Sequence, residues 1–287
     1  MYRGRFAPSP TGPLHLGSLV AAVGSYLRAR QHQGQWLLRM EDLDPLREVA
    51  GAADNILHTL EAHGLFWDGE AVYQSQRHEY YQDALQTLIN KKLAYACRCT
   101  RKALKQTAKT GEFGIIYPGT CRSLNHPFTG RHAMRLKTHN HLLCFNDGRL
   151  GEHCQRLESE VGDFIIKRSD GYFAYQLAVV VDDYLQGISE VVRGEDLLDN
   201  TQRQIYLQQL LGYTKPDYYH LPMVTDDQGQ KLSKQTHAPA LINTEASKNL
   251  IQALQLLKKV DIKPELEELR SEKPEHILNW AVNHCLL

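Results

Sequence analysis

The chain has 287 residues, of which 42% are hydrophobic and 23% charged, and its formal net charge is zero. This composition predicts a globular protein with one large or two small domains, and it argues against broad, non-specific binding of nucleic acid while leaving room for a local basic face. No apolar run approaches the ~18 residues of a membrane span, and the N-terminus does not resemble a signal peptide. We therefore expect a cytoplasmic protein, and a monomer because no large apolar stripe demands a partner.

The stretch 5–18 is predicted to contain the end of a strand at 2–7, a stiff loop and the start of a helix. Helix and central strand are excluded from the loop by its prolines, Pro8, Pro10 and Pro13. An apolar period of three and four begins at Leu14 and predicts a helix with His15 in its first turn. Unpaired N–H groups at a helix start, together with a histidine donor, can hold phosphate. The alternative is an ordinary loop whose histidine caps the helix.

Strand and helix patterns alternate up to residue 92, which is the rhythm of a doubly wound parallel sheet. The strand 36–40 runs into Glu41, and acidic side chains at the carboxyl end of a buried strand lie where open α/β sheets bind ligands. The rhythm breaks at residue 94 and resumes at 162. Residues 172–181 fit a strand, or from 173 the beginning of a helix. Further helices are predicted at 51–64, 76–92, 201–211, 247–258 and 275–286, and further strands at 132–136, 164–166, 188–193 and 219–224.

A second loop, Lys231-Leu-Ser-Lys234, follows a predicted strand and a glycine turn. Two lysines three positions apart in a loop can clamp a polyphosphate, because lysine acts as a mobile point charge. A solvated basic loop is the better interpretation of this pattern when it is taken alone.

Three of the six cysteines lie close together, as Cys97-x-Cys99 followed by Cys121. Three soft thiolates suit zinc, which prefers four tetrahedral ligands, so we expect a metal rather than three unbound thiols. The residues themselves leave the fourth ligand open among His126, His132, Cys144, Cys154 and Tyr117. No neighbouring Glu or His pair suggests an activated water, so the metal would be structural. Cys144, Cys154 and Cys285 are otherwise interpreted as ordinary residues.

The two loops together resemble the paired signatures of class I aminoacyl-tRNA synthetases, usually written HIGH and KMSKS. They read His15-Leu-Gly-Ser18 and Lys231-Leu-Ser-Lys-Gln235 here, with mild departures at Ser18, Leu232 and Gln235. The runs Arg5-Phe-Ala-Pro-Ser-Pro-Thr-Gly12 and 179–196 further resemble glutamyl-tRNA synthetases. The resemblance covers about residues 1–240 and implies a Rossmann-like α/β fold.

Only 52 residues follow Gln235, which is too few for the anticodon-binding region of glutamyl-tRNA synthetases. The run 231–241 and the cysteine cluster resemble the truncated branch of that family, the glutamyl-queuosine tRNA(Asp) synthetases. This resemblance implies that glutamate is activated with ATP in the absence of tRNA. It is then attached to the queuosine base at the wobble position of tRNA(Asp).

The resemblance also implies roles for individual positions. Those for glutamate are Arg5, Phe6, Ala7, Pro8, Ser9, Glu41, Tyr175 and Arg193. Those for ATP, which is expected with Mg²⁺, are His15, Gly17, Ser18 and Lys234, and the catalytic groups are His15, Lys231 and Lys234. The family pattern selects Tyr117 as the fourth ligand of one structural zinc, beside Cys97, Cys99 and Cys121. Taken singly, the glutamate residues also have structural interpretations, such as a core aromatic for Tyr175 or a salt-bridge partner for Glu41.

The expected organisation is the first half of a Rossmann catalytic domain at 1–94, an inserted acceptor-binding-like subdomain with zinc at 95–160, the second half with the KMSKS-like loop at 161–240, and a helical segment at 241–287. The alternatives are a short glutamyl-tRNA synthetase that charges the 3′ end of tRNA(Glu), a non-catalytic synthetase-like binding module, and a nucleotidyltransferase that makes a different adenylate.

Overall fold

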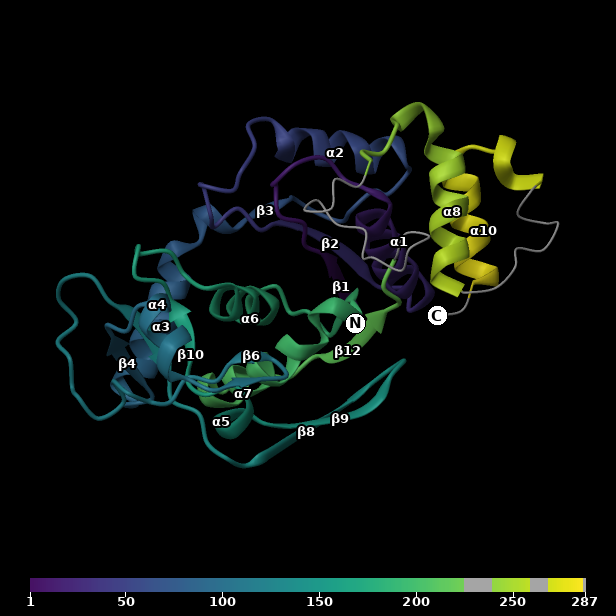
Figure 1. Ribbon diagram of the computed structural model, residues 1–287. Helices are drawn as coiled ribbons and strands as arrows, with labels where there is room; N and C mark the ends of the chain where they lie inside the picture. The colour runs from purple at the N-terminus through teal and green to yellow at the C-terminus, as the bar shows by residue number, and fades with distance from the viewer. Residues whose placement is uncertain (225–238, 259–267, 286–287) are drawn as a thin grey trace. The chain divides into compact units, whose positions relative to one another are not determined.

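The computed structural model describes residues 1–224, 239–258 and 268–285 (Figure 1). The chain divides into two compact units, each described here by itself. The first comprises Met1–Ser75, Ile188–Leu197 and Pro216–Leu287, and the second comprises Gln76–Gly187 and Leu198–Lys215. No helix in the described ranges is long and apolar enough to cross a membrane.

A parallel sheet forms the centre of the first unit. Strand β1 (Arg3–Phe6) pairs with β2 (Gln35–Met40), β2 pairs with β3 (Val72–Tyr73), and β11 (Glu190–Gly194) pairs with β12 (Asp217–Leu221), all in parallel register. Strand β1 lies beside β11, because the Ser189 N–H donates to Arg3 O at 3.0 Å and Arg5 Nη1 donates to Val192 O at 3.4 Å. Residue numbers rise in the same direction along both strands from the first contact to the second, so β1 and β11 run parallel. The carboxyl ends of β1, β2 and β11 therefore lie at one edge of the sheet.

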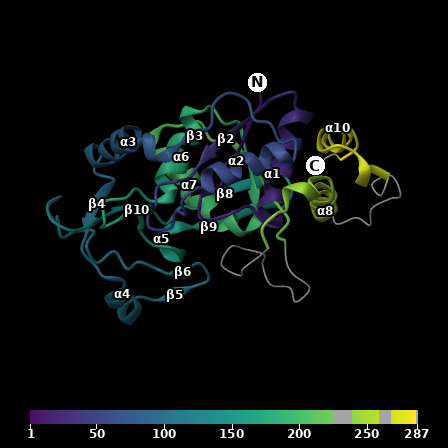
Figure 2. The same cartoon turned by 90° about the horizontal axis from the view of Figure 1, so that it is seen from above.

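Helix α1 (Leu16–Gln31) packs on this sheet through its buried apolar face. Helices α8 (Ala246–Lys258) and α10 (Pro274–His284) lie side by side against α1, as Figures 1 and 2 show. A Cβ added to Gly24 of α1 would meet Leu221 Cδ1 at 2.5 Å, so a larger residue here would force the Leu221 side chain to move. The unit also contains α2 (Ala52–Ala62) and the 3₁₀ turns Asn243–Glu245 and Leu269–Ser271, and two further 3₁₀ turns, Gln74–Gln76 and Glu195–Asn200, begin in this unit and end in the second.

A buried histidine links α2 to α8 in the core of the first unit. The His63 Nδ1 lies 2.7 Å from Thr59 O, and Asn249 Nδ2 lies 3.1 Å from His63 Nε2. Because the carbonyl can only accept and the amide nitrogen can only donate, the ring is neutral with its proton on Nδ1. Burial lowers the pKa of His63, in opposition to the bond with Thr59 O.

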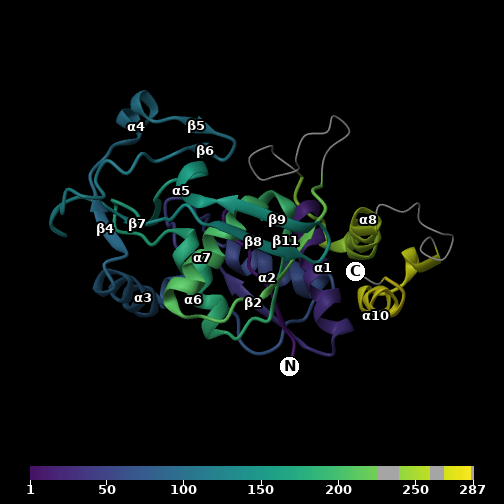
Figure 3. The same ribbon diagram turned by 90° about the horizontal axis from the view of Figure 1, so that it is seen from below.

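The second unit combines helices with short antiparallel sheets. Helices α3 (His78–Asn90), α6 (Tyr175–Leu185) and α7 (Thr201–Leu211) pack together, and β7 (Ala133–Leu136) pairs with β4 (Ala94–Cys97) on one side and β10 (Phe164–Lys167) on the other. Strands β8 (Leu142–Asp147) and β9 (Gly151–Arg156) form a hairpin. Helix α4 (Arg101–Thr107) lies beside the hairpin of β5 (Thr110–Gly111) and β6 (Gly114–Ile115) in Figures 2 and 3, and α5 (Leu157–Glu160) follows β9.

Asp182 of α6 serves the core of the second unit. Its carboxylate is fully buried and accepts Arg77 Nε at 2.6 Å and Tyr81 OH at 2.7 Å. A buried charge with an opposite charge and a further donor is tolerated, whereas a lone one is not. The contacts of Asp182, which lies in the family-like run 179–196, are therefore structural here.

Most predicted elements are confirmed, with shifts of one to three residues at their ends. The strand interpretation of 172–181 is wrong and the helical alternative is confirmed, because the run from Gln176 to Asp183 is buried on all sides and has no polar face to reveal a period of 3.6. His15 is the N-cap of α1 rather than a first-turn residue. The predicted strand at 219–224 is shifted, to Asp217–Leu221.

The interpretation of Cys144 and Cys154 as ordinary residues is wrong. The two residues face each other across the β8–β9 hairpin, with Cα atoms 4.1 Å apart, and form a disulfide. Cross-strand neighbours in an antiparallel pair lie within disulfide range, but that register is visible only once the hairpin is known. Cys144 and Cys154 are thereby removed from the possible metal ligands, while Cys285 is buried in the core of the first unit.

Candidate functional site

Three of the residues predicted to bind glutamate converge at the carboxyl edge of the first unit's sheet. Arg5 lies near the end of β1 and is 3% exposed, Glu41 follows β2 directly, and Arg193 lies in β11 and is 5% exposed. Arg5 contacts the carbonyl of Val192, the neighbour of Arg193. In open α/β sheets this edge is where ligands bind. Arg39 of β2 is also fully buried, and its Nη2 lies 3.5 Å from Glu41 Oε1. Buried guanidinium groups at this edge provide a setting for an anionic ligand group.

Arg193 is held by a histidine on the neighbouring strand. Its Nε lies 3.1 Å from Nε2 of His220, which is fully buried on β12. Because a guanidinium nitrogen can only donate, His220 Nε2 accepts this bond and the imidazole is neutral. This hydrogen bond fixes the Nε edge of the Arg193 guanidinium. A residue of β12 therefore sets the orientation of the planar group.

His15 caps the first helix and has a defined tautomer. Its backbone is extended (φ −122°, ψ 174°), its Nδ1 accepts the Ser18 N–H at 3.4 Å, and Ser18 Oγ accepts the His15 N–H at 3.4 Å. This reciprocal capping box satisfies two groups at the helix start. Because Nδ1 accepts, the neutral ring carries its proton on Nε2, which makes that nitrogen a donor. Gly17 is the second residue of the helix.

The chain returns to this helix start after the second predicted motif. The Leu241 N–H donates to Leu14 O at 2.9 Å, and Ala240 forms a bridge with His15. Lys231 and Lys234 lie outside the described residues, so their placement stays a prediction. Ala240 is only six positions after Lys234 in the sequence.

The loop between β1 and α1 is tied to the same edge. Phe6 packs in the core against Trp36, with ring centroids 6.3 Å apart. The Pro8 carbonyl accepts the Glu41 N–H at 2.9 Å, which joins the loop to the end of β2. Ala7 is half-buried and Ser9 exposed. Gly12 has a φ of 138°, a conformation that favours glycine.

Tyr175, the remaining residue predicted to bind glutamate, is the first residue of α6 and belongs to the second unit. Its side chain is half-buried. Its participation with Arg5, Glu41 and Arg193 stays a prediction.

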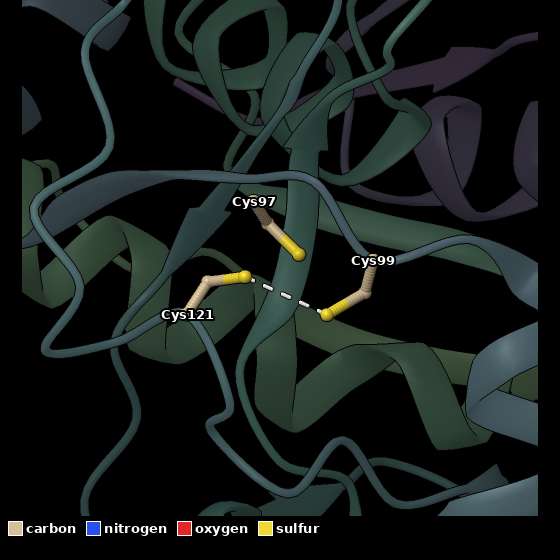
Figure 4. Close-up of side chains that lie close together, drawn as sticks. All are labelled: Cys97, Cys99 and Cys121. Carbon is tan, nitrogen blue, oxygen red and sulfur yellow. Dashed lines mark hydrogen bonds between the residues drawn. The ribbon is translucent and has the colours of Figure 1, made fainter.

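The cysteine cluster lies in the second unit, between the end of β4 and the turn that contains Cys121 (Figure 4). The sulfur atoms of Cys97, Cys99 and Cys121 lie within 4.8 Å of one another, and those of Cys99 and Cys121 are 3.5 Å apart. The hydroxyl of Tyr117 lies 3.3 Å from Cys97 Sγ and 3.6 Å from Cys99 Sγ, and it accepts the Cys121 N–H at 3.0 Å. The tyrosine oxygen is therefore the fourth member of the group.

This donor set fits a soft divalent metal such as zinc. Tetrahedral zinc holds sulfur at ~2.3 Å, which separates its ligand atoms by roughly 3.8 Å, close to the observed spacing. Burial raises the pKa of Cys97, but hydrogen bonds with Tyr117, the backbone of Cys99 and Arg135 outweigh it, so its pKa is lowered. Burial and the neighbouring thiols raise the pKa of Cys99 to about 11, in opposition to Tyr117. Without a metal, the thiol of Cys97 thus ionises more readily than that of Cys99.

Two residues of these sites were not predicted from the sequence. His220 positions Arg193, and Arg135 contacts both Cys97 and Tyr117. The available signal for Arg135 was a single charged residue inside the predicted strand 132–136. His220 precedes Leu221 at the end of its strand and carried no comparable signal.

Comparison with known proteins agrees with this geometry. The family described as "tRNA synthetases class I (E and Q), catalytic domain" matches residues 1–259, which is most of the chain. The fold is thus that of a class I tRNA synthetase catalytic domain.

The curated relatives are more specific. The chain is 51% identical to a Chromobacterium violaceum protein named Glutamyl-Q tRNA(Asp) synthetase, over 99% of this chain and 95% of that protein. A protein of the same name from Neisseria meningitidis serogroup B is 50% identical over 99% of this chain and 95% of that protein. Another from Thiobacillus denitrificans is 53% identical over 98% of this chain and 92% of that protein. The chain therefore belongs to the glutamyl-Q tRNA(Asp) synthetase family within the class I tRNA synthetases.

Solved structures agree on the fold. A glutamate tRNA ligase from Elizabethkingia meningosepticum superposes with a TM-score of 0.72 at 22% identity, over 98% of this chain and 79% of that one. A methionyl-tRNA synthetase from Mycobacterium tuberculosis superposes with a TM-score of 0.57 at 11% identity, over 90% of this chain and 64% of that one. At such identities the likeness concerns the fold, and it confirms the predicted α/β class I architecture with a parallel sheet.

Proposed function

We propose that this chain activates glutamate with ATP in the absence of tRNA and transfers it to the queuosine base of tRNA(Asp). Membership of the family and the names of its close relatives support the reaction. The structural observation that carries the proposal is the convergence of Arg5, Glu41 and Arg193 at the sheet edge. The enzyme is accordingly an ATP-dependent, adenylate-forming ligase.

The first step is adenylate formation. The α-carboxylate of glutamate attacks the α-phosphate of ATP, a new C–O–P bond forms, and pyrophosphate leaves with the electrons of the broken P–O bond. The protein supplies positioning and charge stabilisation rather than a covalent nucleophile. His15 Nε2–H, the N–H groups at the start of α1, including that of Gly17, and the hydroxyl proton of Ser18 would hold phosphate oxygens. Lys234, with Lys231, would stabilise the leaving pyrophosphate.

Glutamate would be selected by charge complementarity. Arg5 and Arg193 supply guanidinium groups for carboxylate, and Glu41 supplies a carboxylate for the α-ammonium group. We include the loop Phe6–Ser9, whose Pro8 carbonyl accepts the Glu41 N–H, as a further contact, and Tyr175 stays a position that the family resemblance implies. The second step transfers glutamate from the adenylate to a hydroxyl of queuosine, with release of AMP and a proton.

Zinc and Mg²⁺ complete the proposed chemistry. Cys97, Cys99, Tyr117 and Cys121 would hold one zinc ion in a structural role, supported by the four donor atoms grouped at the end of β4. Mg²⁺ would accompany ATP and neutralise part of its phosphate charge. The domain organisation stays as predicted, with residues 95–160 as the inserted zinc-containing subdomain. We also retain a monomer in the cytoplasm as a proposal.

Glutamate-dependent exchange of labelled pyrophosphate into ATP tests the first half of this function. We expect exchange with glutamate in the absence of any tRNA, and at least ~100-fold less with glutamine, which lacks the charged carboxylate that the guanidinium groups would pair with. Exchange that requires tRNA, or that is equal with glutamine, would contradict the proposal.

A further inference from the structure

Arg135 occupies the middle of a buried sheet. It lies on β7, the central strand between β4 and β10, opposite Tyr95 and Ile165. All four residues of β7 are buried, and Arg135 itself is 7% exposed. A guanidinium group placed here has lost most of its hydration, so the protein must compensate its charge.

The side chain points at the cysteine cluster. Arg135 Nε donates to Cys97 Sγ at 3.3 Å, and Arg135 Cζ lies 3.7 Å from the centroid of the Tyr117 ring. Its Nη1 donates to the backbone oxygen of Asp163 at 2.6 Å. One guanidinium therefore touches two of the four proposed metal ligands and is anchored by a fixed carbonyl.

Arg135 differs from Arg77 and Arg122 of the second unit in its counter-charge. Arg77 pairs with Asp182 at 2.6 Å, and Arg122 pairs with Glu158 at 2.7 Å. Within the described part of the chain, no ion pair joins Arg135 to a carboxylate. The side chain of Asp163 instead accepts Tyr95 OH at 2.5 Å and the Thr138 N–H at 2.7 Å, and it pairs with Arg122 Nε at 3.3 Å. The thiol of Cys97, 3.3 Å from Arg135 Nε, is the group through which the cluster itself would supply a negative charge to this guanidinium.

The charge of the proposed metal site matches this arrangement. Three thiolates around a divalent ion leave one negative charge, and a phenolate would add a second. A buried group of that charge needs a cation or several donors nearby, and residues outside the ligand shell orient ligands and tune metal affinity. Arg135 supplies a cation, a hydrogen bond to one ligand and a flat surface that holds the ring of another.

We propose that Arg135 is the buried counter-charge and positioning residue of the metal site, and that it sets the affinity of the site for a soft divalent metal. The inference rests on the proposed zinc site. It concerns Arg135, which contacts two of the proposed ligands and is not itself a ligand.

The test compares four full-length proteins: wild type, Arg135→Met, Arg135→Lys and the control Arg77→Met. The control removes an arginine of the same unit that is bonded to a buried carboxylate and does not touch the cluster. Zinc affinity is measured by competition with a chromophoric chelator. Co²⁺ substitution gives a second readout through its thiolate charge-transfer and d–d absorption, and circular dichroism monitors folding.

We expect Arg135→Met to weaken zinc binding about 10- to 100-fold and to alter the Co²⁺ spectrum. Arg135→Lys keeps the charge but loses the planar guanidinium and its contact with the Tyr117 ring, so zinc binding should weaken by about 3- to 10-fold. This variant decides the test if Arg135→Met does not fold. Arg77→Met should bind zinc like wild type. Wild-type affinity in Arg135→Lys or a folded Arg135→Met, or an equal loss in Arg77→Met, would overturn the inference. A wild-type protein that binds no zinc would overturn the metal site itself.

Discussion

The sheet edge of the first unit and the cysteine cluster of the second are built in opposite ways. The edge gathers residues from positions 5, 15, 41 and 193, which parallel strand topology brings to one end of a sheet. The cluster uses residues within 97 to 121, so the end of β4 and the turn after β6 place all its donors. A local motif can thus be interpreted from spacing, whereas a dispersed site requires the fold or a family resemblance.

The two sites also differ in the sign of the ligand they fit. At the edge, Arg5 and Arg193 are buried cations that would meet an anionic substrate. In the cluster, the donors would be anions that meet a metal cation, and Arg135 offsets their excess charge. Removing Arg5 or Arg193 should therefore weaken glutamate binding by the first unit, and removing Arg135 should weaken zinc affinity in the second.

The largest expected effect is that of Arg193→Met. Loss of a buried guanidinium that pairs with a substrate carboxylate should raise KM for glutamate about 100-fold, since a desolvated charge contact is worth several kcal/mol. The matched control is Arg28→Met, which breaks the 2.5 Å pair with Glu190 at the other end of the same strand. Pyrophosphate exchange as a function of glutamate concentration distinguishes the two. Equal KM changes in both variants would show that Arg193 acts only on the fold.

Lys234→Ala should lower the rate of adenylate formation more than ~10-fold with the fold intact, because one lost charge contact in a transition state is worth a few kcal/mol. Lys248→Ala, which removes an exposed lysine paired with Glu245, serves as control. Pyrophosphate exchange measures both. Unchanged exchange in Lys234→Ala would remove this residue from the mechanism.

For the cluster, we expect about one zinc ion per chain by elemental analysis and none in Cys121→Ser. The metal-free variant should unfold several degrees lower, because metal binding contributes to folding free energy. Chelation of the wild type should reproduce the lower unfolding temperature. A metal-free wild-type protein that is folded and active would contradict the structural role.

A smaller effect is expected from His63, whose pKa is lowered by burial. Because the unfolded chain binds the proton more readily, the contribution of neutral His63 is complete above about pH 6.5 and decreases as the pH falls below that value. The free energy of unfolding of the wild type should therefore fall more steeply between pH 7 and 5 than that of His63→Gln. Chemical denaturation at several pH values measures the difference, and parallel slopes would refute the assignment.

Much of the fold was predictable because its elements carry local signals. Helix 201–211 has the predicted ends, and the buried strand 36–40 was identified from its apolar run. The β8–β9 hairpin was missed because its strands alternate weakly, and with it the register that joins Cys144 to Cys154. The interpretation of 172–181 was ambiguous because a helix buried on all sides has no polar face.

The sites were predictable to different degrees for the same physical reason. The spacing of Cys97, Cys99 and Cys121 indicated a metal by itself. The family pattern selected Tyr117 as fourth ligand, which stays a prediction, and its hydroxyl lies 3.3 Å from Cys97 Sγ. The roles of Arg5 and Arg193 came from the resemblance, whereas Glu41 also carried a local signal, its position after the predicted buried strand 36–40. His220 and Arg135 could not be assigned, because their contacts depend on neighbours in other strands.

The central claim is most directly tested by the acceptor. Labelled glutamate, ATP and the enzyme are incubated with tRNA(Asp) that carries queuosine, with tRNA(Asp) that lacks it, and with tRNA(Glu). We predict label only on the queuosine-containing tRNA(Asp), where it should be found on the modified base and not at the 3′ end. Transfer to tRNA(Glu), or equal transfer to both forms of tRNA(Asp), would contradict the proposed function.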